Sequence, residues 1–124
     1  KKIFIADDDT NFVKLITVLL KSRGFEVVSA SDGEESLRRI PEEKPSLAIV
    51  DLRLPKVDGW HVCQRLKSNQ ETKHIPLIVL SGLVDREGEK DMMDQGDFYF
   101  SKPFEAEELV NKIRELLGEK RPGE

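Results

Sequence analysis

The middle of this 124-residue sequence contains the apolar run Leu47-Ala48-Ile49-Val50, which is followed directly by Asp51. The run does not alternate with polar residues, and this is typical of a strand that is covered on both faces, as in a parallel sheet. Four more short apolar runs lie on either side of it along the chain: Ile3–Ala6, Val27–Ala30, Leu77–Leu80 and Phe98–Phe100. The sequence therefore predicts five strands, and the first and fourth are continuous in the same way.

The segments between the strands have a helical period. Two apolar stripes recur at the spacing of one helix face: Phe12, Ile16, Leu19 and Leu20 in the first segment, and Leu109, Val110, Ile113, Leu116 and Leu117 in the last. Strands and helices thus alternate along the whole chain. This order predicts an α/β domain with a doubly wound, five-stranded parallel sheet.

Capping residues predict where the helices begin and end. The expected limits are Thr10 and Gly24 for the first helix, Ser31 or Asp32 and the residue before Pro41 for the second, about Trp60–Ser68 for the third, and Asp85 and Gly96 for the fourth, over Arg86–Gln95. The fourth segment has few apolar residues, so we expect it to be the least stable helix.

Composition excludes several classes of protein. The net charge of −4 argues against nucleic acid as a partner of the whole surface, and the single cysteine, Cys63, excludes an intrachain disulfide framework. No apolar run approaches the roughly 18 residues that a transmembrane helix needs. We therefore expect a cytoplasmic protein that does not bind membranes, with one domain over residues 1–118 and a tail or truncated linker over 119–124.

Polar residues follow four of the strands where each strand ends. Asp7 and Asp8 follow the first run, Asp51 the third, Ser81 the fourth and Lys102 the fifth. Ligands of parallel α/β sheets bind outside the carboxyl ends of the strands, so these side chains should converge. Grouped carboxylates repel one another unless a cation joins them, and oxygen ligands favour Mg²⁺. A lysine and a hydroxyl opposite the metal could hold phosphoryl oxygens. The carboxylates, the lysine and the hydroxyl together predict a phosphoryl-transfer site.

Each of these features alone has a simpler explanation. A run of three aspartates before a helix is commonly a solvated capping segment, and an aspartate at a strand end is often only a turn former. The hypothesis of a site depends on their occurring together at one end of an independently predicted sheet.

In their order and spacing, these residues resemble the receiver domain of two-component response regulators, the CheY-like superfamily. The resemblance covers Lys2 to about Leu117, and four motifs carry it: Ile3-Phe4-Ile5-Ala6-Asp7-Asp8-Asp9, Ile49-Val50-Asp51-Leu52-Arg53-Leu54-Pro55 with Asp58-Gly59, Val79-Leu80-Ser81-Gly82, and Tyr99-Phe100-Ser101-Lys102-Pro103-Phe104. It implies the flavodoxin-like fold of five β–α units with strand order 2-1-3-4-5.

The resemblance also implies a role for each site residue. Asp51 would be the phospho-acceptor, and Mg²⁺, for which Mn²⁺ can substitute, would be held by Asp7, Asp8, Asp51 and the backbone carbonyl of Arg53. Ser81 would be the switch hydroxyl, Lys102 would pair with the phosphoryl group, and Tyr99 would be the switch aromatic. The Lys102–Pro103 peptide bond is expected to be cis.

The resemblance further implies the partners. A histidine kinase, a phosphotransfer domain or a small donor such as acetyl phosphate would supply the phosphoryl group. A downstream effector protein or a fused output domain would read the face formed by the fourth helix, the fifth strand and the last helix, and phosphorylation could produce a dimer. Such a domain takes part in its own phosphorylation and dephosphorylation but does not turn over external substrates, and it contacts no nucleic acid itself.

Two departures from the family pattern stand out. Gly96-Asp97-Phe98-Tyr99 is one residue shorter than the common Gly-Ala-x-x-Tyr, and Gly82 stands where a small residue, often alanine, is usual. Gly82 should leave Ser81 accessible while loosening the loop. We also expect Arg53 and Leu83, each two positions beyond a site residue, to influence the lifetime of the phosphorylated state.

Three other functions remain as alternatives. A phosphatase of the haloacid-dehalogenase type needs a second aspartate two residues after the nucleophile, where this sequence has Arg53. A flavodoxin-like cofactor binder needs a phosphate loop after the first strand, where three carboxylates would repel the FMN phosphate. A degenerate receiver would act only as a protein-interaction module.

Four other conspicuous residues are expected outside the chemistry. Cys63 should be a small buried side chain, His61 and His74 should bind nothing at the site, and Trp60 should lie near its rim.

Overall fold

The computed structural model describes residues 1–82 and 97–119 of the chain. Its elements, in chain order, are β1 (Lys2–Ala6), α1 (Thr10–Ser22), β2 (Glu26–Ala30), α2 (Gly33–Glu43), β3 (Leu47–Asp51), α3 (Gly59–Ser68), β4 (Leu77–Ser81), β5 (Phe98–Ser101) and α5 (Ala106–Leu116). The helix expected over Arg86–Gln95, its limits at Asp85 and Gly96, and the role expected for Leu83 lie outside the described residues.

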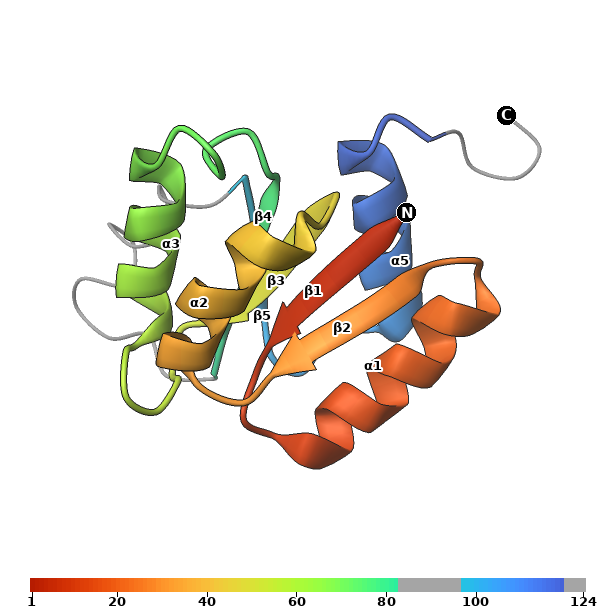
Figure 1. Cartoon of the computed structure of the whole chain (residues 1–124). Coiled ribbons are helices and arrows are strands. Elements are labelled where there is room, and N and C mark those ends of the chain that lie inside the picture. Colours follow the sequence, from red (N-terminus) through yellow and green to blue (C-terminus); the bar gives the residue numbers. More distant parts are fainter. Residues whose placement is uncertain (83–96, 120–124) are drawn as a thin grey trace.

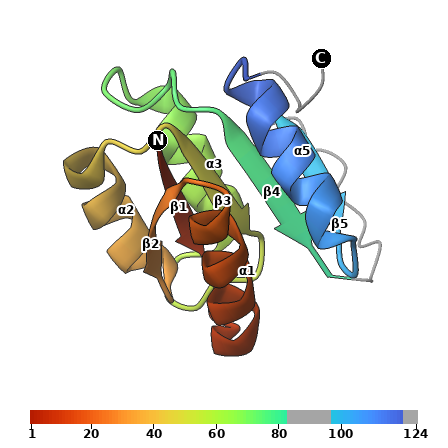
Figure 2. The same ribbon diagram turned by 90° about the vertical axis from the view of Figure 1, so that its right-hand side faces the viewer.

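The strands form one parallel sheet in the order β2-β1-β3-β4-β5, which confirms the predicted topology. Helices α2 and α3 cover one face of the sheet, and α1 and α5 cover the other (Figures 1 and 2). All five residues of β3 and of β4 are buried, whereas β2 at the edge begins with the exposed Glu26. The continuous apolar runs therefore mark the central strands, as predicted.

Each central strand supplies two separate cores, because successive side chains point to opposite faces. In β3, Ala48 and Val50 join the core beneath α2 and α3, and Leu47 and Ile49 join the core beneath α1 and α5. The apolar stripes predicted for the first and last helices close the second core through Ile16, Leu20, Leu109, Val110 and Ile113. Each central strand therefore contributes alternate residues to the cores on both faces of the sheet.

Two of the predicted helix limits are wrong. Thr10 does not cap α1: it is the first helical residue, and the Oδ1 atom of Asp9 accepts a hydrogen bond from the Phe12 amide at 3.1 Å. The second helix does not end before Pro41 but continues to Glu43. A proline removes only its own amide from the hydrogen-bond ladder, and the Lys44 amide still bonds the Ile40 carbonyl at 3.0 Å and closes the last turn.

The other limits agree with expectation. Asp32 caps α2 through the Glu35 amide, and Gly24 follows α1 with a φ of +91°, a left-handed conformation that glycine adopts without strain. Within the described part of the chain, no helix has both the length and the apolar character needed to cross a bilayer.

Candidate functional site

The site lies at the carboxyl end of the sheet. β1 ends one residue before Asp7, β3 ends at Asp51, β4 ends at Ser81, and β5 ends one residue before Lys102. Because all five strands are parallel, these ends lie along one edge of the sheet (Figure 2). The residue positions predicted from the sequence therefore come together.

Three carboxylates form the acidic part of the site. Oxygen atoms of Asp7, Asp8 and Asp51 lie within 4.8 Å of one another. Asp7 is 2% exposed and Asp51 is 7% exposed, whereas Asp8 faces solvent. An all-oxygen set with two buried members and one exposed member matches the ligands that Mg²⁺ prefers, with room for water on the open side.

The ammonium of Lys102 joins the two buried carboxylates. Its Nζ atom donates to Asp7 Oδ2 at 2.9 Å and to Asp51 Oδ2 at 3.0 Å. It also lies 4.4 Å from the centre of the Phe12 ring, within the range of a cation–π contact. One lysine therefore bridges β1 and β3 from the end of β5.

Burial and hydrogen bonding shift the pKa values of Asp7 and Lys102. Burial raises the pKa of Asp7, and so does the nearby charge of Asp51, although hydrogen bonds from Lys102 and from the Asp9 amide oppose the shift. For Lys102, burial acts to lower the pKa, but the hydrogen bonds to Asp7 and Asp51 outweigh it and raise the pKa overall. The lysine therefore stays charged beside carboxylates that still repel each other, an arrangement that a divalent cation would complete.

Backbone amides hold the other oxygen of each buried carboxylate. The Asp9 amide donates to Asp7 Oδ1 at 2.9 Å, and the Arg53 amide donates to Asp51 Oδ1 at 2.8 Å. In both cases the aspartate accepts from the residue two positions ahead, as in an Asx turn. Both carboxylates are thus fixed at one oxygen by their own loop and at the other by Lys102.

The loop after β3 folds back closely on Asp51. The Gly59 amide donates to the Leu52 carbonyl at 2.9 Å, and a Cβ atom added at Gly59 would lie 1.9 Å from the Asp51 carbonyl oxygen. Only glycine fits at this contact. Asp58 caps α3 by accepting from the His61 amide at 3.0 Å, so the Asp58-Gly59 motif positions both the helix and the loop that contains Arg53.

The fourth and fifth strands place the remaining predicted residues. Ser81 is buried, and the Lys102 amide donates to its carbonyl at 2.8 Å, so these two residues are neighbours. Tyr99 pairs with Val79 in the sheet and packs, half-buried, against the core beneath α2 and α3. A Cβ atom added at Gly82 would meet nothing within 4 Å, so a small side chain would fit at this position. The Lys102–Pro103 peptide bond is cis, as expected.

The structure gives the surroundings of three of the residues expected outside the chemistry, and it confirms that Cys63 is buried. Cys63 is buried, and burial raises the pKa of its thiol to about 12. His61 bonds Asp58 through its ring at 2.8 Å and lies outside the acidic cluster. Trp60 is half-buried against the core beneath α2 and α3.

Sequence reasoning missed two parts of the site. The amides of Asp9 and Arg53 hold the carboxylates, and a signal for them existed in the aspartate two residues before each. The Phe12 ring beside Lys102 had no such signal, because Phe12 only continued the apolar stripe of its helix.

Comparisons with known proteins agree with this geometry. The family model of the response regulator receiver domain matches residues 3–114. The DNA-binding dual master transcriptional regulator RpaA of Synechocystis sp. is 38% identical over 117 residues, which are 94% of this chain and 48% of that protein. The chain thus spans about half the length of the curated relatives it matches.

Solved structures show the same relationship. A Chloroflexus aurantiacus chain assigned to the response regulators superposes with a TM-score of 0.87 at 31% identity, over 94% of this chain and 97% of that one. The response regulator TrrA of Thermotoga maritima, solved in complex with Mg(2+)-BeF, superposes with a TM-score of 0.83 at 27% identity, over 94% of this chain and 98% of that one. The chain therefore belongs to the response regulator receiver domain family and is a receiver domain of the two-component type.

Proposed function

We propose that Asp51 is the residue of this receiver domain that accepts a phosphoryl group. The observation that carries the proposal is the position of its carboxylate, which lies at the end of a fully buried central strand, beside two other carboxylates and 3.0 Å from the Lys102 ammonium. A buried carboxylate that is held in one orientation by hydrogen bonds to both of its oxygen atoms is a positioned nucleophile.

The reaction is a transfer to a carboxylate oxygen. Asp51 attacks the phosphorus of a phosphohistidine on a histidine kinase or phosphotransfer domain, or of an acyl phosphate such as acetyl phosphate. The bond from phosphorus to nitrogen or oxygen breaks, and the leaving atom keeps the electron pair. A phosphohistidine nitrogen then takes up a proton, and the product is an acyl phosphate on Asp51, which water later hydrolyses. The domain is a phospho-acceptor that undergoes this cycle itself and turns over no external substrate.

Mg²⁺ would be held by Asp7, Asp8, Asp51 and the Arg53 carbonyl, and Mn²⁺ can take its place. When bound, the cation supplies neutralisation of the negative charge shared by the carboxylates and the phosphoryl oxygens. The three carboxylates support this assignment, because their oxygen atoms lie within 4.8 Å of one another and offer the all-oxygen ligand set that Mg²⁺ prefers.

Lys102 and Ser81 act on the phosphoryl group from the other side. Lys102 leaves Asp51 Oδ2 and pairs with a phosphoryl oxygen, while Arg53 keeps its amide on Asp51 Oδ1. The Ser81 hydroxyl turns toward the phosphoryl group, and Tyr99 moves with it. This rearrangement would pass through β5 to the face that it shares with α5, where an effector or output domain reads the state.

The proposal is tested by phosphorylation with labelled acetyl phosphate and Mg²⁺. The wild-type domain should incorporate an acid-stable but base-labile and hydroxylamine-sensitive phosphoryl group, as an acyl phosphate does, and Asp51→Asn should incorporate none. The matched control is Asp58→Asn, which makes the same change of atom in a residue outside the acidic cluster and keeps the ability to cap α3. Full labelling of Asp51→Asn would refute the assignment.

We further propose that residues 1–118 form the receiver and that 119–124 form a tail or linker. The relatives are about twice as long as this chain, which supports a role coupled to an output domain or to a separate effector. The kinase partner would be identified by phosphotransfer profiling, and a phosphorylation-dependent dimer by sedimentation with and without beryllofluoride.

A further inference from the structure

Asp97, the residue directly before β5, bonds Leu77, the first residue of β4, at two points. Its Oδ2 atom accepts from the Leu77 amide at 2.7 Å, and its own amide donates to the Leu77 carbonyl at 2.8 Å. Leu77 is fully buried, so its amide needs an acceptor inside the protein, and the Asp97 carboxylate supplies it. Asp97 therefore joins the starts of β4 and β5, at the end of the sheet opposite to the acidic site.

The β5 strand depends on this contact because its own residues specify its register only weakly. It has four residues, Phe98–Ser101, and lies at the edge of the sheet beside β4. Of these four residues only Phe100 is buried, so a slip of the strand would expose few apolar side chains. Asp97 bonds Leu77 one position before the pairing of β4 with β5 begins. A slip by one residue would break both bonds between Asp97 and Leu77.

Lys67, in the last turn of α3, holds the Asp97 carboxylate from a second side. Its ammonium donates to Asp97 Oδ2 at 2.9 Å, and also to the carbonyls of Ile75 at 3.1 Å and Lys73 at 3.4 Å. The Lys67 side chain is 27% exposed. With three acceptors around it, this ammonium has less freedom than one in an ordinary surface ion pair. The end of α3, the segment between α3 and β4, and the start of β5 therefore meet at one group.

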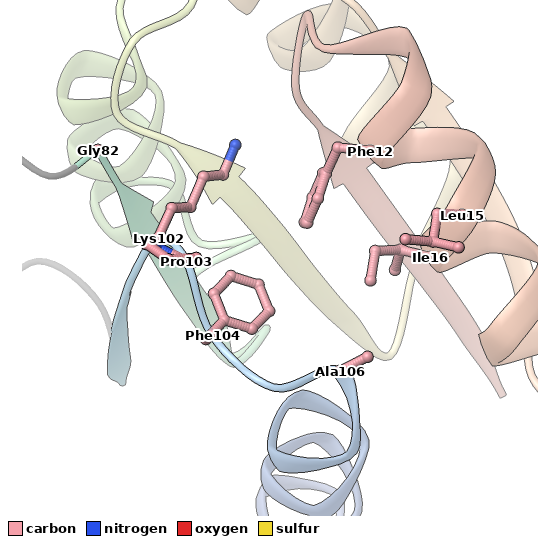
Figure 3. Close-up of a pocket in the computed structure, with 8 residues that line it drawn as sticks. All are labelled: Phe12, Leu15, Ile16, Gly82, Lys102, Pro103, Phe104 and Ala106. Carbon is pink, nitrogen blue, oxygen red and sulfur yellow. The ribbon is translucent and has the colours of Figure 1, made fainter.

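Helix α3 connects this contact to the loop that follows Asp51. The first residue of the helix, Gly59, packs against the Asp51 carbonyl, and Lys67 in the last turn bonds Asp97. β5 then runs back to the carboxyl end of the sheet, where Lys102 donates to Asp51 at 3.0 Å. Figure 3 shows the Lys102 side chain extending from the end of β5 toward the end of β3. The contacts thus form a closed ring, from Asp51 through α3 and Asp97 to β5 and back through Lys102.

The register of β5 decides where two residues of the site lie. Along a strand each residue advances about 3.3 Å, and successive side chains point to opposite faces. A slip of one residue would therefore move the backbone of Lys102 by that distance relative to Asp51 and turn Tyr99 away from the core beneath α2 and α3. A smaller shift would still misplace the ammonium that, as proposed above, pairs with a phosphoryl oxygen.

We propose that Asp97 is a positioning residue of the phospho-acceptor site, which fixes the register of β5 through Leu77 and Lys67 and so places Lys102 and Tyr99. The anchoring of β5 stands on the contacts alone, and its consequence for phosphorylation rests on the proposed function. Metal binding should not depend on Asp97, because the three carboxylates come at the ends of β1 and β3. A contact that only stabilised the fold would leave the reaction of the folded protein unchanged.

The anchoring is tested in EDTA by NMR of the ¹⁵N-labelled protein. Asp97→Ala removes both side-chain bonds, so it should shift the amide signals of Tyr99 and Lys102. It should also raise the hydrogen-exchange rates of these two amides about tenfold relative to those of β3, because β5 then opens locally. Asp97→Asn keeps an oxygen that can accept from the Leu77 amide, and it should retain most of the protection. Unchanged shifts and protection at Tyr99 and Lys102 would overturn the proposal.

Two variants of Lys67 test the same anchor with a smaller change. Lys67→Met removes the ammonium and leaves the bond from the Leu77 amide to Asp97, so its effect on β5 should be weaker than that of Asp97→Ala. Lys67→Arg restores a cation and should recover the wild-type shifts. If Asp97→Ala does not fold, this pair decides the question, and a β5 unaffected by Lys67→Met would then overturn the proposal.

The consequence for the reaction is measured with labelled acetyl phosphate at saturating Mg²⁺. Asp97→Ala should lower the rate of labelling about tenfold, because a misplaced Lys102 no longer pairs well with the phosphoryl oxygen. The dissociation constant for Mg²⁺, titrated separately, should stay at the wild-type value. Asp97→Asn should recover most of the lost rate. A wild-type rate in Asp97→Ala, or a loss of Mg²⁺ affinity as large as the loss of rate, would overturn the proposal.

Thr72→Val is the matched control for a loss of stability alone. Thr72 is buried between α3 and β4, and its hydroxyl donates to the Leu66 carbonyl at 2.7 Å, a bond that does not involve β5. Its loss should lower the urea midpoint, as Asp97→Ala should, but leave the rate of labelling unchanged. Equal slowing by Thr72→Val would mean that lost stability explains the effect, and the proposal fails. If the wild-type domain takes up no label, the proposed function fails, while the NMR measurements still test the anchoring.

Discussion

Two lysines of this domain each lie between two carboxylates, one at each end of β1. Lys2 pairs with Glu26 and Glu43 at 3.6 and 3.5 Å, and Lys102 pairs with Asp7 and Asp51 at 2.9 and 3.0 Å. The glutamate side chains are 67% and 29% exposed, whereas the aspartate side chains are 0% and 11% exposed. The same three charges therefore form a surface contact at one end of the sheet and a candidate reaction site at the other.

The difference comes from what fixes the carboxylates. At the Lys102 end, each buried carboxylate also accepts a hydrogen bond from a backbone amide two residues ahead. At the Lys2 end, the Glu26 side chain is largely exposed and that of Glu43 is half-buried, and the Lys2 ammonium also donates to the Glu43 backbone carbonyl at 3.1 Å. A surface ion pair between mobile side chains contributes little, because solvent screens it and ordering the side chains is unfavourable. Burial and backbone anchoring, rather than charge, distinguish the two ends.

The largest effect should come from breaking the backbone anchor of Asp51. Gly59→Ala places a Cβ atom against the Asp51 carbonyl, which must move together with the loop that donates the Arg53 amide. We expect a loss of about 3 kcal/mol in the free energy of unfolding, measured by urea denaturation, together with a strong loss of Asp51 phosphorylation. Gly82→Ala is the control, since its Cβ atom meets nothing within 4 Å, and it should change stability by less than about 0.5 kcal/mol. Equal effects of the two changes would contradict the role of the anchor.

The next largest effect should come from the two lysines themselves. Lys102→Met leaves two buried carboxylates without their shared cation, and we expect it to cost about 2 kcal/mol in EDTA. Chemical denaturation of this variant and of Lys2→Met, under the same conditions, measures the difference between the two ends. A similar loss for both lysines would show that burial does not separate them.

Magnesium should stabilise the folded domain by binding at the Lys102 end of the sheet. At ten times its dissociation constant, the cation should raise the free energy of unfolding by about 1.4 kcal/mol, because it binds the folded chain alone. Thermal unfolding with and without Mg²⁺ measures this gain. Asp7→Asn should abolish it, and Asp58→Asn should retain it. A gain that survives Asp7→Asn would place the cation elsewhere.

The smallest effect is expected at Lys2. Lys2→Met should cost at most about 0.5 kcal/mol, and about 1 M NaCl should remove the difference from the wild type by screening. The loss caused by Lys102→Met should persist at the same salt concentration. A penalty for Lys2→Met that persists at high salt would mean that contacts other than the ion pairs with Glu26 and Glu43 account for it.

Local patterns in the sequence predicted the strands and the convergence of the site residues at one edge of the sheet. Continuous apolar runs identified β1, β3 and β4 as central, and the polar residue after each strand marked the edge of the sheet. The family resemblance added the strand order. These signals are short in sequence and act through a topology that has few alternatives.

What the sequence did not predict depends on three-dimensional contacts or on balances between similar energies. Thr10 and Asp9 are both good capping residues, and only the backbone conformation of Asp9 decided between them. Pro41 ended the helix in the prediction because its cost was not weighed against the remaining bonds of the last turn. The contact of Phe12 with Lys102 joins residues 90 positions apart, which no local pattern encodes.

The two-sided burial of β3 also bears on how the chain finds its pairing during folding. In a strand with one polar face, a slip of one residue exposes apolar side chains and is rejected. A slip of one residue within Leu47–Val50 would only move apolar side chains from the core on one face of the sheet to the core on the other. Asp51 makes such a slip unfavourable, because shifting the strand by one position toward its start would bury the Asp51 carboxylate in an apolar core. The proposed phospho-acceptor would thus also help to specify the register in which β3 pairs with its neighbouring strands.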